Sequence, residues 1–241
     1  MTIVLLHSSG LSARQWQYAA TALRARGERV VVPDLIGHGE QPAWPEPRPM
    51  SFRDDVARVV ELLAAEDAPV ALGGHSYGGL VALAAAREAP ERIAELWLYD
   101  PVAFGVLDPA RDADALAELA AIDLQWARGA EAWLTGFVDY WGGAGAWAAL
   151  REPVRAEFRR VAWVVQEGVR SLMGDATPAS AYAAAIAAPA RLATGEHSPL
   201  AARRVVARLA EVLRATTAVV RGAGHMGPMT HAAQVTAFFA P

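Results

Sequence analysis

Short apolar runs alternate with longer helical patterns through the first hundred residues of the chain. Runs rich in β-branched residues predict strands, and stretches with alanine and leucine at helical spacing predict helices. The predicted strands cover residues 3–6, 28–32, 70–72 and 93–99, and the predicted helices cover residues 14–26, 51–66 and 76–89. This alternation predicts an α/β fold, a mostly parallel sheet with helices on both faces.

The alternation stops after Asp100 and resumes near residue 189. Residues 101–188 show only helical patterns and turn signals, and five of the eight tryptophans lie there. Strands are predicted again over residues 190–194 and 216–220, and helices over residues 199–213 and 231–239. We therefore expect an α/β core made of residues 1–100 and 189–241, with residues 101–188 forming a helical cap.

The composition narrows the function classes. The chain has no cysteine, which excludes a disulfide scaffold, a zinc–thiolate site and a cysteine nucleophile. A net charge of −4 without a basic block argues against a nucleic-acid partner. No apolar run reaches the ~18 residues of a membrane span. The N-terminal apolar run is short and follows no basic residue, so no signal peptide is predicted and a cytoplasmic location is the default expectation. No metal-ligand spacing or nucleotide fingerprint is visible, so we expect no metal and no cofactor.

The most informative stretch joins the strand at 70–72 to the helix at 76–89. It reads Gly74-His75-Ser76-Tyr77-Gly78, a G-x-S-x-G motif. A serine at a sharp strand-to-helix turn projects its hydroxyl above the sheet edge, and small residues on both sides let the backbones approach. The helix begins at the serine, so the amide of Tyr77 is placed to donate to an oxyanion. The pattern predicts that Ser76 is a nucleophile, against the alternative of an N-cap serine beside packing glycines.

Three further segments accompany this motif, in order and at fitting distances: residues 6–11, residues 34–39 (Asp-Leu-Ile-Gly-His-Gly) and residues 222–228. Together they resemble the α/β-hydrolase family over residues 3–239. The resemblance implies an α/β-hydrolase fold, here trimmed to six strands because family members usually have two antiparallel strands before the first one seen. It makes the amide of Ser9 the second oxyanion donor, with Ser8 replacing the usual glycine. It gives the 34–39 loop a structural role, so His38 has no chemistry.

A general base must reach Ser76. His225 follows the predicted strand 216–220 in a glycine-rich loop, which can bring its imidazole over the sheet edge, and the resemblance indicates the same residue. His231 lies in the next helix and is expected to be exposed or capping. His75 precedes the nucleophile and is expected to point off the opposite side of the turn.

The acid of the triad is less clearly marked. The family usually has an aspartate at the position of Ser198, and serine cannot carry the charge. Asp100 ends the strand 93–99 at the carboxyl edge of the sheet, where sites of parallel sheets lie. We favour Asp100 on this ground, and keep two alternatives: Glu196, or a dyad without acid, which would be a slow enzyme.

The cap is expected to roof an apolar pocket. We take Phe104, Trp133 and Trp141 from the cap, with Ser8 from the core, as substrate-contacting residues. The pattern then predicts a serine hydrolase that cleaves a small to medium apolar carboxylic ester through an acyl-enzyme. Two alternatives stay open: carbon–carbon hydrolysis of a diketone by the same residues, and a non-catalytic small-ligand-binding protein of the same fold.

Overall fold

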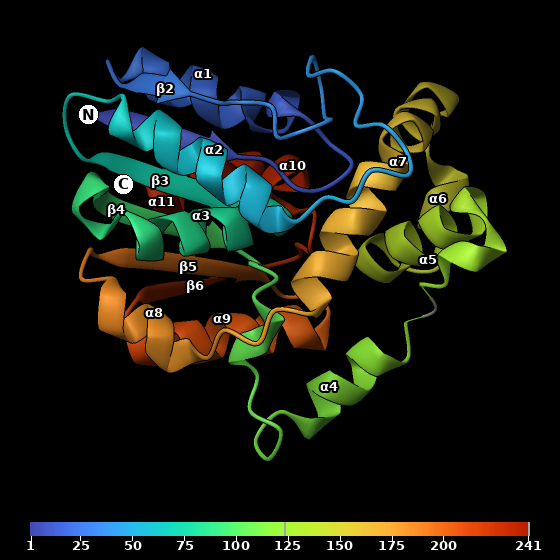
Figure 1. Cartoon of the computed structure of the whole chain (residues 1–241). Helices are drawn as coiled ribbons and strands as arrows, with labels where there is room; N and C mark the ends of the chain where they lie inside the picture. The colour runs from blue at the N-terminus through green and yellow to red at the C-terminus, as the bar shows by residue number, and fades with distance from the viewer. Residues whose placement is uncertain (123, 241) are drawn as a thin grey trace.

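Six parallel strands form one sheet at the centre of the molecule (Figure 1). The structure is a computed structural model, and it describes residues 1–122 and 124–240. In chain order the strands are β1 (Thr2–Leu6), β2 (Arg29–Val31), β3 (Val70–His75), β4 (Ile93–Tyr99), β5 (Ala190–Gly195) and β6 (Thr216–Val220). They lie side by side in the order β2-β1-β3-β4-β5-β6. The predicted α/β fold and the six-strand sheet are confirmed.

Helices cover both faces of this sheet (Figure 1). One face carries α2 (Phe52–Ala64), α3 (Tyr77–Glu88), α8 (Ala179–Ala185) and α9 (Leu200–Leu213), and the other carries α1 (Gln17–Ala25) and α11 (Ala232–Phe239). Successive strand side chains alternate between the two layers: Val4 and Leu6 pack into the larger core, whereas Ile3 and Leu5 pack against α1. The continuous apolar runs are explained by this burial on both faces.

Two local differences from the predicted elements concern the site. Strand β3 continues past Leu72, because Gly73, Gly74 and His75 pair with Trp97, Leu98 and Tyr99 of β4. Glycine lowers strand propensity, so sequence patterns end the strand too early. A short helix α10 (Gly227–Thr230), not predicted, begins two residues after His225.

Four helices extend beyond the carboxyl ends of the strands (Figure 1). They are α4 (Ala113–Ala120), α5 (Ala130–Gly142), α6 (Ala146–Ala149) and α7 (Glu152–Met173). No strand occurs between β4 and β5 in the described residues. Helix α8 instead packs beside α3 and α9 on the face of the sheet. Within residues 1–122 and 124–240, no helix is both long enough and apolar enough to cross a bilayer.

Candidate active site

Ser76 sits on a turn whose geometry only small neighbours permit. Its backbone has φ +55° and ψ −120°, an unfavourable conformation for a residue with a side chain. A Cβ on Gly74 would lie 2.2 Å from the carbonyl oxygen of Gly78, and a Cβ on Gly78 would lie 2.4 Å from that of His7. The two glycines therefore let β3 turn into α3 while α3 packs against the end of β1.

The loop that carries His225 is fixed by two hydrogen bonds from neighbouring strands. Nε2 of His75 donates to the carbonyl oxygen of His225 at 2.8 Å, and the hydroxyl of Tyr99 donates to that of Gly224 at 2.8 Å. The rings of His75 and His225 lie 4.7 Å apart. His75 was expected to point off the opposite side of the turn from Ser76. Strand β3 continues through residue 75 and directs this side chain beneath the loop, where it supports the backbone of His225.

Ser76, His225 and Asp100 form a continuous hydrogen-bonded chain. The hydroxyl of Ser76 lies 2.9 Å from Nε2 of His225, and Nδ1 of His225 lies 3.2 Å from Oδ2 of Asp100. Asp100 directly follows β4 and has φ +42°, a left-handed conformation that aspartate tolerates better than most residues. This arrangement holds the imidazole with its Nδ1 proton toward the carboxylate and its free Nε2 toward the serine.

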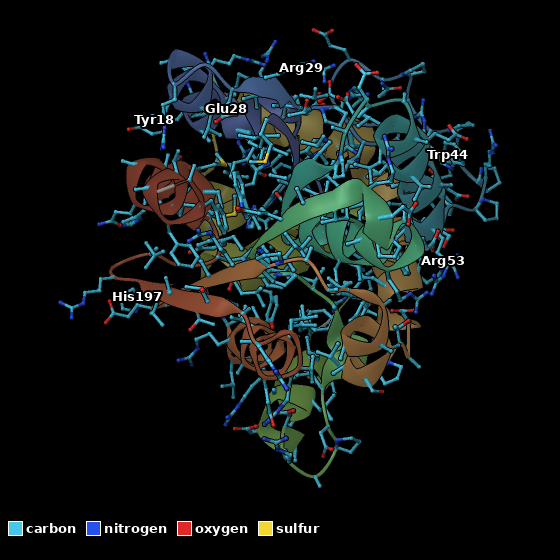
Figure 2. The ribbon with its side chains drawn as sticks, turned by 90° about the vertical axis from the view of Figure 1, so that its left-hand side faces the viewer. Tyr18, Glu28, Arg29, Trp44, Arg53 and His197 are labelled. Atoms are coloured by element: carbon cyan, nitrogen blue, oxygen red, sulfur yellow. The ribbon has the colours of Figure 1, made fainter. Side chains whose placement is uncertain are left out.

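Ser198 occupies the position where the family usually has an acid, and it contacts Asp100. Its hydroxyl donates to Oδ2 of Asp100 at 2.5 Å and accepts from the amide of Gly195 at 3.0 Å. Glu196, the alternative acid, is exposed and accepts from the amide of Gly222. Figure 2 shows the adjacent His197 on the outer surface. The turn after β5 thus directs Ser198 toward the buried Asp100 and Glu196 toward the solvent.

Burial shifts the pKa values of His225 and Asp100. His225 is 2% exposed and Asp100 is fully buried. Burial lowers the pKa of the His225 imidazole, so it is neutral and able to accept a proton near pH 7. Burial raises the pKa of Asp100, and the hydrogen bond from Ser198 opposes this by favouring the charged carboxylate. Ser198 therefore helps Asp100 to hold a negative charge beside the imidazole.

The amides of Ser9 and Tyr77 are free to bind an anion. In the described part of the chain, neither N–H has a hydrogen-bond partner. Both residues line the cavity at Ser76. Helix α3 begins at Tyr77, so its dipole adds positive potential at the same place. The two amides expected as oxyanion donors therefore lie at the same cavity as the hydroxyl of Ser76.

Two buried histidines shape the loop that carries Ser9. Nε2 of His7 accepts from the amide of Leu35 at 3.0 Å, and Nε2 of His38 accepts from the amide of Gly10 at 3.1 Å. Burial lowers the pKa of His7 to about 4 and that of His38 to about 3, so both rings stay neutral acceptors. His38 holds the backbone and does not reach Ser76, which fits the structural role expected for it.

Ser8 is also tied into this loop. Its amide and its hydroxyl both donate to Oε1 of Gln15, each at 2.9 Å. The serine thus replaces glycine without leaving the loop unsupported. Ser8 lines the wider of two cavities at the site, as expected of a substrate-contacting residue, although its hydroxyl already has a partner.

Two apolar cavities meet at Ser76. The narrow cavity measures about 30 Å³ and is lined by Tyr77, Val102, Phe104, Leu119, Leu172 and Met173, among others. The wide cavity measures about 240 Å³ and is lined by Leu11, Val154, Phe158, His225, Met226 and Met229, among others. Ser9, Ser76, Phe137 and Trp141 border both. Among residues 1–122 and 124–240, neither lining contains an aspartate, glutamate, lysine or arginine.

Trp141 and Trp133, both within residues 101–188, differ in their positions. The indole of Trp141 stacks on the imidazole of His225, with ring centroids 3.8 Å apart and planes 24° apart. Phe104 also lines a cavity, as expected. Trp133 does not: it is 2% exposed and packs against Phe137 and Trp126 among the cap helices. An aromatic residue at helical spacing is expected both in a packed core and in a substrate pocket, so the sequence pattern does not distinguish the two roles. In the structure, Trp133 is a core residue.

Sequence reasoning missed the function of Asp55. Its carboxylate accepts from the hydroxyl of Tyr77 at 2.8 Å and from the amide of Ile36 at 2.9 Å, while burial raises its pKa to about 6. It thereby anchors the first residue of α3. A signal was present, because Asp55 follows Phe52 by three residues and falls on the buried face of α2 with Val59.

Comparison with known proteins identifies the family that shares this fold. A family model described as the Alpha/beta hydrolase family matches residues 3–238. The chain belongs to the alpha/beta hydrolase family. This alpha/beta hydrolase is 33% identical to Lipase LipV of Mycobacterium tuberculosis over 130 residues, which make up 52% of this chain and 44% of the lipase. It is 33% identical to 2-hydroxymuconate semialdehyde hydrolase of Pseudomonas sp. over 100 residues, 40% of this chain and 35% of that enzyme.

The matched part of this alpha/beta hydrolase thus spans less than half of either curated relative. Among solved structures, a hydrolase from Oleispira antarctica superposes with a TM-score of 0.75 at 21% identity, covering 98% of this chain and 88% of that one. At this identity the likeness establishes the shared fold.

Proposed function

We propose that this alpha/beta hydrolase is a serine esterase that cleaves a neutral, apolar carboxylic ester through an acyl-enzyme. The observation that carries the proposal is the hydrogen-bonded chain from Ser76 through His225 to Asp100, which opens onto two apolar cavities. The oxygen of Ser76 attacks the ester carbonyl while Nε2 of His225 takes its proton. Asp100 stabilises the resulting imidazolium.

The oxyanion then forms beside the amides of Ser9 and Tyr77, which donate to it. His225 returns its proton to the leaving alcohol, which departs and leaves an acyl group on Ser76. Water enters, loses a proton to His225 and attacks the acyl carbon. The bond from this carbon to the oxygen of Ser76 then breaks, His225 returns its proton to that oxygen, and the acid is released. Each proton in this cycle moves through the same nitrogen, which is why the neutral state of the buried imidazole matters.

The described lining residues carry no charged side chain, which favours an ester over an ionised substrate. An anion bound there would be removed from water without a counter-charge, which is costly in an apolar site. Carbon–carbon hydrolysis of a neutral diketone would fit the same linings, and one curated relative is named as a semialdehyde hydrolase. The ester is preferred because its cleavage needs only the groups described, whereas carbon–carbon cleavage also requires a proton donor for a carbanion.

A fluorophosphonate probe tests the nucleophile directly. We expect stoichiometric labelling of the wild-type chain and none of Ser76→Ala. Ser180→Ala is the matched control, because Ser180 is exposed on α8 and outside both cavities. Turnover of p-nitrophenyl acetate should follow the same order. Equal labelling of Ser76→Ala and wild type would exclude Ser76 as the nucleophile. Labelling without turnover of any ester would shift the assignment to the diketone.

A further inference from the structure

We propose, on the basis of the esterase function above, that the substrate has a small acyl group and a large apolar alcohol. The acyl group occupies the narrow cavity. The alcohol occupies the wide cavity and extends from there into a groove on the surface. The proposal thus assigns the two sides of the scissile bond to two spaces of unequal size.

The position of His225 determines which cavity receives the alcohol and which receives the acyl group. The leaving alcohol must receive its proton from Nε2 of His225, so its oxygen and first carbons lie beside the imidazole. His225 lines the wide cavity and does not line the narrow one. The narrow cavity is instead bordered by Tyr77 and Val102, on the other side of Ser76. The remaining substituent of the carbonyl carbon, the acyl chain, therefore points into the narrow cavity.

The volumes of the two cavities limit the sizes of the acyl group and the alcohol. The narrow cavity measures about 30 Å³, room for about two water molecules when one needs roughly 10–15 Å³ by this measure. An acetyl or propionyl group fits such a space. The wide cavity measures about 240 Å³, eight times as much, and is lined by large apolar side chains such as Phe158 and Met226. The difference favours substrates whose bulk lies in the alcohol.

The wide cavity adjoins a groove on the surface. Leu11, Val154 and Met229 line both this cavity and a groove of about 960 Å³ that runs along α1. Met229 is 49% exposed, and Tyr18, which also lines the groove, is 54% exposed. Figure 2 shows Tyr18 on the outer surface. In the proposed binding mode, a long alcohol chain passes from the cavity into this groove between Leu11, Val154 and Met229. The groove is also lined by Arg14 and Glu157, so it accommodates a polar end of the alcohol.

Two isomeric esters test the assignment. Octyl acetate and methyl nonanoate have the same atoms and similar hydrophobicity, and differ only in which side of the ester is long. We expect kcat/KM for octyl acetate to exceed that for methyl nonanoate by about tenfold or more, because a chain too long for its pocket loses binding in the transition state. Equal values, or a preference for methyl nonanoate, would overturn the proposal.

Variants locate the effect in each cavity. Val154→Trp narrows the passage to the groove, and should lower kcat/KM for octyl acetate at least about tenfold more than that for ethyl acetate. Val219→Trp is the matched control, because Val219 is 62% exposed on the edge strand β6 and remote from both cavities. It should leave the ratio of the two esters as in wild type.

Met173→Ala opens the narrow cavity at a residue that is 45% exposed, so the core is little disturbed. It should raise turnover of methyl nonanoate relative to octyl acetate. Failure of both variants to change the ratios would contradict the assignment even if octyl acetate is the better wild-type substrate. Absence of fluorophosphonate labelling at Ser76 would instead contradict the esterase function itself, so the two failures are distinguishable.

Discussion

The hydroxyl of Ser198 lies 2.5 Å from Oδ2 of Asp100, the same carboxylate oxygen that lies 3.2 Å from Nδ1 of His225. A serine at the usual acid position thus supports an aspartate from the neighbouring strand. Its hydrogen bond favours the ionised carboxylate in a fully buried place. The negative charge beside His225 is therefore maintained by two residues from two strand ends.

Ser198→Ala should weaken this charge. We expect kcat for p-nitrophenyl acetate to fall about tenfold, the usual order for losing a hydrogen bond to a charged group. The carboxylate loses a donor, so the apparent pKa of the Asp100–His225 pair rises and the ascending limb of the pH–rate profile moves to higher pH. Ser198→Thr keeps the hydroxyl and should restore the profile. A variant profile identical to wild type would show that Ser198 only packs.

Asp100→Asn distinguishes the candidate acids. The amide keeps the shape but presents the wrong hydrogen-bonding group to the imidazole, and kcat should fall ~10⁴-fold, as in tested serine proteases. Glu196→Gln should leave kcat unchanged, because Glu196 is exposed and bonds the amide of Gly222. Steady-state rates on one ester measure both. Full activity in Asp100→Asn would support a dyad, and a large loss in Glu196→Gln would support the other acid.

His38→Gln should alter the pH dependence of stability. The native ring stays neutral down to about pH 3, whereas in the unfolded chain it takes up a proton below its ordinary pKa of 6.5. Between these values the unfolded state binds more protons, so this histidine's contribution to the unfolding free energy falls as pH falls, by ~1.4 kcal/mol per pH unit.

Urea unfolding at pH 7, 6 and 5 checks this. At pH 7 the variant should be less stable, because the amide of Gly10 loses its ring acceptor. The difference in unfolding free energy between the wild type and His38→Gln should become smaller toward pH 5. Taking the difference removes the contributions of Asp55 and Asp100, whose raised pKa values act in the opposite direction. Parallel stability curves would show that His38 titrates alike in both states.

Gly78→Ala tests the close approach of α3 and β1. The added Cβ would lie 2.4 Å from the carbonyl oxygen of His7 and 2.5 Å from that of Leu6, both backbone atoms that cannot rotate away. We expect a loss of about 3 kcal/mol or more in unfolding free energy, at the upper end of overpacking costs. Gly174→Ala, whose Cβ would meet nothing nearer than 3.6 Å, is the control and should change stability by less than about 1 kcal/mol.

Some features of the fold and the site depend on residues that are neighbours in the sequence, and these could be predicted; others depend on distant segments, and these could not. Strand β4 was predicted at its observed bounds because seven apolar-rich residues lie between a proline-led turn and Asp100. Ser76 and Tyr77 were also found locally, since the strand, turn and helix that place them are consecutive. Trp133 was misjudged, and the support that His75 gives to the His225 loop was not foreseen, because the surroundings of both side chains come from other segments.

The sequence by itself determined the parallel sheet, the turn that carries the serine and the loop that carries the histidine. Each of these depends on residues that are contiguous in the chain: the apolar periodicity of the strands and helices, and the glycine-containing motifs at the turn and the loop. Only the tertiary structure decided which carboxylate serves His225, since that depends on β4 and β5 lying side by side so that Ser198 faces Asp100. It alone also decided the unequal cavities, because empty space is what remains after side chains from distant segments have packed.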